Sequence, residues 1–213
     1  MRPAHHPSEA ILADYASGAL ADGPSLAVSA HLESCSSCRR AIRLFEAVGG
    51  ELLEETAPAA MNADALALAL ARIDRPAPQP PPAVLRAGPE GLRLPRALAA
   101  RGVGPRRFVA PGYWVAPVPS NSPDGWRTYL LRAPAGGSVF HHGHNGAEYT
   151  VVLRGAVLDG EDHYKVGDFS ECGEDDDHQP GAEGSGPCIC LITGQGGLRV
   201  RGVLRLLQPL LGV

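Results

Sequence analysis

Residues 136–155 read GGSVFHHGHNGAEYTVVLRG, and this stretch decides how the second half of the chain folds. His142 and His144 are two residues apart, so on a β-strand both side chains point to the same face. Glu148 opens the next apolar run, and Gly155 marks the turn that follows it. We therefore expect two short strands that carry two imidazoles and one carboxylate.

A further histidine follows downstream. Gly167 and Asp168 form another turn signal on an apolar framework, and His178 comes after them. Three imidazoles and one carboxylate suit divalent metals such as zinc, iron, manganese, nickel or copper. The predicted ligands of this metal are His142, His144, Glu148 and His178. His141 should point to the opposite face of the strand and is not a predicted ligand.

The sequence around these residues predicts an all-β domain from residue 106 to residue 213. Apolar residues alternate with period two between turns rich in Gly, Pro, Asn and Asp. Many short strands at close spacing favour a sandwich or a small barrel such as a jelly roll. The predicted strands cover residues 113–118, 126–132, 148–153, 188–192 and 198–206. Cys188 and Cys190 fall on one face of a strand, as small core residues or as a redox-sensing pair.

The motif Gly136-x5-His142-x-His144-x3-Glu148-x6-Gly155 resembles the first motif of the cupin family. Gly167-Asp168 and His178 resemble a loosened second motif. It departs from the family pattern because no proline precedes Gly167 and an acidic insertion of residues 174–177 precedes His178. The resemblance implies a cupin barrel with a metal centre.

The first third of the chain carries a second ligand pattern. Residues 31–38 read HLESCSSC, which places His31, Cys35 and Cys38 in the spacing H-x3-C-x2-C. His31 and Cys35 are one helical turn apart, and Cys38 lies at the start of the next helix, where the helix dipole stabilises a thiolate. Zinc binds four such N and S ligands in a tetrahedron, so His5 or His6 is expected to supply the fourth. A redox pair and two unlinked surface cysteines are the alternatives.

Residues 1–75 are expected to form helices. Ser8 and Glu9 open the first helix, which Gly18 ends, and the second begins near Pro24. The third runs over residues 37–48, and Gly49 and Gly50 weaken or stop it, although Leu52 and Leu53 are placed to continue its pattern. The fourth covers residues 62–74, with a narrow apolar stripe that either binds in a partner's groove or packs on its own domain. This stripe consists of Leu66, Leu70 and Ile73.

The remaining composition limits the classes of function. Residues 76–105 are rich in proline and predict a semi-stiff connector between the two domains. The net charge is −4, and residues 1–75 are the acidic part, which argues against direct binding to nucleic acid. The chain has no apolar run long enough for a transmembrane span and no signal peptide, so a cytoplasmic protein is expected.

The H-x3-C-x2-C pattern, with a histidine upstream, resembles the zinc-binding anti-sigma domain, and His6 matches the family's spacing better than His5. In that family three helices form a zinc-stapled bundle and a fourth reaches over the sigma factor, so that core RNA polymerase cannot engage it. Together with the cupin-like half, the chain resembles the anti-sigma factors of the ChrR type. This implies a 1:1 complex with an extracytoplasmic-function sigma factor, zinc in the helical domain, and a second metal, expected to be zinc, in the cupin domain.

The resemblance further implies that the cupin domain senses a stress signal, photooxidative stress and singlet oxygen in particular, that ends inhibition. The competing hypothesis is a cupin dioxygenase or isomerase with an accessory zinc domain. An enzyme needs an open position on its metal and a substrate pocket. Four-coordinate zinc without turnover favours sensing, whereas iron with oxygen consumption favours catalysis.

Overall fold

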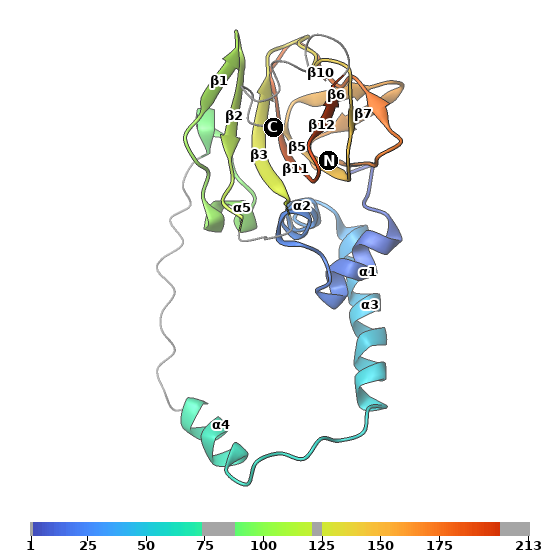
Figure 1. The fold of residues 1–213 in the computed structure, drawn as a ribbon, viewed down its shortest axis with the longest axis vertical. Coiled ribbons are helices and arrows are strands. Elements are labelled where there is room, and N and C mark those ends of the chain that lie inside the picture. Colours follow the sequence, from blue (N-terminus) through green and yellow to red (C-terminus); the bar gives the residue numbers. More distant parts are fainter. Residues whose placement is uncertain (1, 74–87, 121–124, 201–213) are drawn as a thin grey trace.

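A computed structural model describes residues 2–73, 88–120 and 125–200 of the 213-residue chain. Helices come first and strands follow, which confirms the predicted fold class (Figure 1). The helices are α1 (Glu9–Ser17), α2 (Asp22–Leu32), α3 (Ser36–Glu54), α4 (Ala65–Ile73), a 3-10 helix (Pro89–Gly91) and α5 (Arg96–Arg101). The strands are β1 (Arg107–Ala110), β2 (Tyr113–Pro117), β3 (Arg127–Ala133), β4 (His142–His144), β5 (Glu148–Arg154), β6 (Ala156–Asp159), β7 (Asp162–Lys165), β8 (Phe169–Cys172), β9 (Asp177–His178), β10 (Gly181–Glu183), β11 (Cys188–Gly194) and β12 (Leu198–Val200).

The first helix begins and ends where the sequence predicts. The Ser8 hydroxyl caps α1 by accepting a hydrogen bond from the Ile11 amide, which satisfies one of the helix's free N–H groups. Gly18 ends the helix with φ of 75°, a backbone conformation that side chains disfavour. Local capping chemistry is therefore sufficient to place this element.

The third helix does not stop at the two glycines. α3 continues through Gly49 and Gly50 to Glu54, so the expected weakening at that point does not end it. Each glycine costs about 1 kcal/mol relative to alanine in a helix, which Leu52, Leu53 and their helix-forming neighbours offset. Of the two outcomes that the sequence left open, the helix takes the one in which Leu52 and Leu53 continue it, and its second half is exposed.

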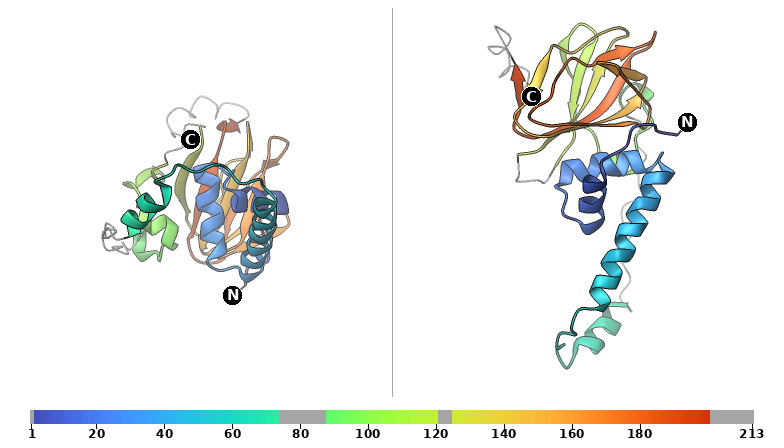
Figure 2. Two further views of the ribbon diagram at one scale, coloured as in Figure 1. Left: turned by 90° about the horizontal axis from the view of Figure 1, so that it is seen from below. Right: turned by 90° about the vertical axis from the view of Figure 1, so that its right-hand side faces the viewer.

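The strands form a barrel of two layers. One layer is a six-stranded antiparallel sheet in the order β1-β2-β3-β11-β5-β8, and the other consists of the three-stranded sheets β10-β6-β7 and β12-β4-β9 (Figure 2). Of the predicted strand over residues 198–206, residues 198–200 form β12 and the rest lie outside the described residues.

The central strand β11 serves two hydrophobic cores. Ile189 and Leu191 face the helices, whereas Cys188, Cys190 and Ile192 face the inside of the barrel. This alternation follows from the period of two along a strand. Both faces of β11 are therefore buried, and one face of the large sheet is available to the helical domain.

The helical domain packs directly on the barrel. α2 lies against β5, β11 and α5, and its Leu26, Ala27 and Val28 belong to the same core as β11 (Figure 1). Gly23 allows this close approach, because a Cβ atom there would overlap the Thr193 hydroxyl and lie 2.7 Å from that of Thr128. The two halves of the chain share one core.

The second part of the predicted connector is folded. Residues 74–87 lie outside the described residues, but Leu92, Leu94 and Leu98 are buried in the core that the helices share with the sheet. Pro89 opens the 3-10 helix and Pro95 caps α5. Proline suits these positions because its fixed φ matches the first helical turn, so part of the proline-rich stretch starts helices instead of acting as a spacer.

The helices α3 and α4 extend away from the barrel (Figures 1 and 2). None of the residues of α4 is buried, and the second half of α3 is largely exposed. Among the described residues, no helix combines the length and the apolar character that a membrane crossing requires.

Two candidate metal centres

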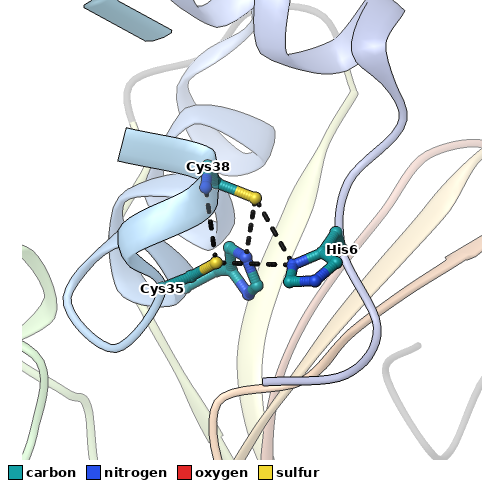
Figure 3. Close-up of side chains that lie close together, drawn as sticks. His6, Cys35 and Cys38 are labelled. Atoms are coloured by element: carbon teal, nitrogen blue, oxygen red, sulfur yellow. Dashed lines mark hydrogen bonds between the residues drawn. The ribbon is translucent and has the colours of Figure 1, made fainter. Parts of the chain in front are cut away.

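The first centre joins three parts of the helical domain. His6 lies in the segment before α1, His31 in the last turn of α2, and Cys35 and Cys38 at the N-cap and in the first turn of α3. The ligand atoms of all four lie within 4.8 Å of one another. Figure 3 shows His6 beside the two cysteines, with its imidazole directed at both sulfur atoms.

The distances fit a tetrahedral zinc ion. Nε2 of His31 lies 3.3 Å from Sγ of Cys38, and Nδ1 of His6 lies 3.4 and 3.5 Å from the two sulfurs. Bonds of about 2.0–2.3 Å in a tetrahedron place N and S ligands roughly 3.3–3.8 Å apart. The donor set of two imidazoles and two thiols, largely buried, suits zinc without rearrangement.

Burial and hydrogen bonds prepare these ligands unequally. Burial lowers the pKa of His31, which favours the neutral imidazole that a metal needs. Burial opposes ionisation of Cys35, but hydrogen bonds from Ser37 and from the Cys38 amide outweigh it and lower the pKa of its thiol. Burial and the neighbouring Cys35 raise the pKa of Cys38 to about 12. Cys35 is therefore the first thiolate, and Cys38 needs the metal's charge to lose its proton.

The barrel holds the outer side of this centre. Nδ1 of His31 donates to the backbone carbonyl of Gly167 at 2.7 Å, which leaves Nε2 directed at Cys38. His5 is not among the grouped ligands; its ring packs against Tyr164 in a tilted arrangement with centroids 4.4 Å apart, and its Nδ1 lies 3.5 Å from Asp168. The geometry thus brings His6, and not His5, to the other three ligands.

The second centre lies inside the barrel. His142 and His144 come from β4, Glu148 begins β5, and His178 is on β9, whose backbone pairs with β4 opposite His142. Nε2 of His178 lies 3.1 Å from Nε2 of His142 and 3.0 Å from Nε2 of His144. The four ligand atoms lie within 4.8 Å of one another. The acidic insertion therefore does not displace His178 from the other three residues.

Two residues that the sequence analysis did not select contact this centre. Asp159, at the end of β6, lies 2.6 Å from Nδ1 of His178, and the Cys172 sulfur lies 3.8 Å from the same nitrogen. A carboxylate behind a metal-binding imidazole fixes its orientation and increases its basicity. Asp159 carries no sequence signal beyond its place before Gly160 in a turn, so only the fold brings it to His178.

The pKa values of the second centre differ widely. Burial lowers the pKa of His142 and brings that of His144 to about 4, so both are neutral and ready to bind a metal. Burial raises the pKa of Glu148 to about 7. Burial also disfavours the charged form of His178, but the hydrogen bonds to Asp159 and Cys172 and the charges of these two groups together outweigh it and raise the pKa to about 10. In the absence of a metal, His178 holds the proton of this cluster.

A cavity of about 540 Å³ adjoins the second centre between the two layers of the barrel. Its walls are mainly apolar, and His142, Glu148 and His178 form part of them. The thiols of Cys188 and Cys190, 3.6 Å apart, also line it. Both cysteines thus share one strand face, as the sequence predicts, and that face is the inner surface of the barrel.

The other predicted or unassigned residues lie away from both centres. His141 is exposed, and His163 lies 3.0 Å from Glu183 on the surface. Leu66, Leu70 and Ile73 of α4 are between 52% and 76% exposed. They pack on no hydrophobic core of the described residues. The fold therefore contradicts the interpretation that α4 packs on its own domain.

Comparisons with known proteins agree with both halves of the chain. A family model for a zinc finger matches residues 9–39, and the model of the ChrR cupin-like domain matches residues 106–196. The anti-sigma-E factor ChrR of Cereibacter sphaeroides is 40% identical in an alignment 212 residues long that covers 96% of this chain and 96% of that protein. The crystal structure of Rhodobacter sphaeroides SigE in complex with the anti-sigma ChrR contains a chain that is 36% identical, with a TM-score of 0.75 over 90% of this chain and 98% of that chain. The chain belongs to the ChrR family of anti-sigma factors.

Proposed function

We propose that this chain is a transcription regulator that binds an extracytoplasmic-function sigma factor 1:1 and keeps it from core RNA polymerase. The observation that carries the proposal is the likeness, over 90% of this chain, to a ChrR chain whose structure was determined in complex with SigE. The likeness covers helices and barrel together, so the proposal concerns the whole molecule. Its place of action is the cytoplasm, and it needs no direct contact with nucleic acid or membrane.

The partner-binding surface that we propose is the pair of helices extending from the barrel. Leu44, Val48 and Leu52 recur every four residues along α3 and are between 52% and 65% exposed. Such spacing places them on one face of the helix, and a contiguous apolar face of this kind is typical of a binding surface. Leu66, Leu70 and Ile73 on α4 form a second such face, suited to a groove on the sigma factor.

Zinc at His6, His31, Cys35 and Cys38 stabilises the base from which α3 extends. These ligands tie the N-terminal segment, α2 and α3 together. Metal binding supplies folding free energy to a small bundle, so the direction of α3 depends on the ion. In the barrel, His142, His144, Glu148 and His178 hold a second divalent metal, which we take to be zinc. There the cupin domain senses the stress signal, photooxidative and based on singlet oxygen, that releases the sigma factor.

The test is purification of the full chain from its own cells, with identification of the bound protein and analysis of its metals. We expect a sigma factor at equal stoichiometry and two zinc ions per chain, one for each ligand group. In vitro transcription with the recovered sigma factor should fall as the chain is added. No partner, one iron per chain and oxygen consumption would instead support a cupin enzyme.

A cysteine variant tests the role of zinc. Cys38→Ser should lose zinc from the first centre and lose sigma binding, because three ligands no longer fix α3. At a free zinc concentration 1,000 times the dissociation constant, the lost metal reduces the free energy of unfolding by about 4 kcal/mol. Cys172→Ser is the matched control and should retain both properties. A zinc-free Cys38→Ser protein that still binds the sigma factor would contradict this role.

A further inference from the structure

The carboxylate of Asp168, in the turn that leads into β8, uses both of its oxygens to hold backbone amides. One oxygen accepts the Lys165 amide at 2.7 Å, a contact within the barrel. The other accepts the amides of Ala4 at 2.6 Å and His5 at 3.2 Å, which belong to the N-terminal segment. Asp168 is only 2% exposed. A carboxylate loses its hydrating water when it is buried, and these amides take the place of that water.

The N-terminal segment continues along β8, the edge strand of the large sheet. The Phe169 amide donates to the His5 carbonyl at 3.2 Å. Further on, Glu171 accepts both the amide and the hydroxyl of Ser8, each at 3.1 Å. His6 lies between these anchored residues, so β8 fixes the path of the backbone that carries this zinc ligand.

The same turn also contacts the second histidine of the zinc centre. The Gly167 carbonyl accepts the Nδ1 proton of His31 at 2.7 Å. Gly167 has φ of 93°, and a Cβ atom there would lie 2.5 Å from the Ser34 hydroxyl oxygen, so the turn and the end of α2 are in direct contact. Both imidazoles of the first centre are therefore positioned from two adjacent residues of the barrel.

We propose that Asp168 is a positioning residue of the N-terminal zinc centre, so that the cupin barrel itself sets how tightly His6 and the anti-sigma helices hold zinc. The inference rests on the zinc centre proposed above and adds a contribution from outside the helical domain. Asp168 acts on the metal specifically through the Ala4 and His5 amides. A purely structural role in the barrel would act through the Lys165 amide instead.

The far end of β8 lies at the second centre. Cys172 is the backbone partner of Glu148 in the sheet, and its sulfur approaches His178. A strand of four residues spans about 13 Å. The two metal centres thus contact opposite ends of one short, rigid element, which gives the barrel a direct physical connection to His6 that does not involve the proline-rich stretch.

The experiment measures metal affinity at each centre of the full chain by cobalt titration. Only the first centre has cysteine ligands, so only there does cobalt give a sulfur-to-metal charge-transfer band. Replacing a residue that orients a metal ligand typically costs 10- to 100-fold in metal affinity, and we expect this loss at the cysteine-containing centre in Asp168→Asn. Cobalt binding at the cupin centre should stay unchanged, whereas the unfolding midpoint of the metal-free protein should fall modestly, because the single acceptor oxygen of Asn cannot serve all the backbone amides that Asp168 accepts.

Two further variants separate positioning from barrel stability. Ala4→Pro removes the amide that bonds Asp168 without altering the barrel or any ligand, and it should reduce the same affinity. Glu183→Gln, on β10, is a carboxylate-to-amide control away from both centres and should behave as wild type. Wild-type affinity in Ala4→Pro and Asp168→Asn would overturn the proposal, as would an equal loss at both centres with a lower unfolding midpoint. If the wild-type chain gave no charge-transfer band, the zinc centre itself would be wrong.

Discussion

Asp159 favours the protonated form of His178 in the metal-free barrel. Its contact of 2.6 Å and the nearby Cys172 together raise the pKa of His178 to about 10 against the opposing effect of burial. His142 and His144 have lowered pKa values and are neutral above pH 7. A metal ion that binds Nε2 of the three imidazoles must therefore displace a proton from His178.

Metal loading of the cupin centre should release about one proton per ion at pH 8.5, because His178 is still protonated there, whereas Glu148, with a pKa of about 7, is already ionised. The raised pKa makes the proton compete with the metal, so apparent affinity rises with pH up to about 10. Calorimetry in two buffers of different ionisation enthalpy measures this release on protein whose first centre is already loaded, because Cys38 there also loses a proton to its metal. Asp159→Asn should lower the pKa of His178 and largely abolish it. An unchanged release in Asp159→Asn would place the proton elsewhere.

Local spacing was sufficient to predict most ligands of both centres. His31, Cys35 and Cys38 lie within two helical turns, and His142, His144 and Glu148 span two adjacent strands. The choice of His6 over His5 depends on Asp168, which is far away in sequence, and spacing alone left it open. Asp159 shows the same limit, because the pairing of β6 with β10, in which Gly181 lies opposite Leu158, brings this end of β6 close to His178.

Among the elements, α2 has the tightest fit against the barrel, and Gly23 makes it possible. Gly23→Ala should reduce the free energy of unfolding by about 1–3 kcal/mol, because the added methyl group overlaps the buried Thr128–Thr193 hydroxyl pair. Gly49→Ala is the matched control, since nothing lies within 4 Å of its added Cβ atom. It should stabilise α3 by up to about 1 kcal/mol. Denaturant unfolding of the two variants should give opposite signs, and equal effects would show that α2 does not pack as described.

Element boundaries were predictable where the chemistry is local. Ser8 begins α1 with its side chain as the cap, and Gly18 ends α1 through its backbone conformation. The sequence left the end of α3 open between Gly49 and the residues after Leu53, and the helix continues because the cost of two glycines is small beside the contribution of a whole helix. The prolines are visible in the sequence and led to the prediction of a connector that includes residues 88–105. The fold of this segment was missed because the burial of Leu92, Leu94 and Leu98 depends on the distant β-sheet.

The helical domain and the barrel form one body that carries two separate functional regions, the exposed helices and the cupin centre. The helical domain and the barrel share a core along α2 and β11. The helices α3 and α4 extend away from the barrel (Figure 2) and carry exposed apolar side chains, whereas the cupin ligands line the cavity inside the barrel. A partner bound on α3 and α4 therefore need not touch the cupin ligands, and a signal at those ligands must pass through the shared core or along β8.

This separation predicts distinct effects on inhibition and on release. His142→Ala should leave inhibition of the sigma factor intact in the dark, because neither the zinc centre nor the exposed helices lose a contact. It should blunt release when a photosensitiser generates singlet oxygen. Allosteric coupling typically changes affinity about 5- to 150-fold. Singlet oxygen should lower the affinity of the wild-type chain for the sigma factor by a factor in this range, and His142→Ala should lose most of that decrease. Retention of the sigma factor on immobilised protein measures the affinity. His141→Ala, the exposed neighbour, should respond as wild type. Loss of inhibition in the dark would mean that the cupin centre supports the helices structurally, and normal release in light would place the sensor elsewhere in the molecule.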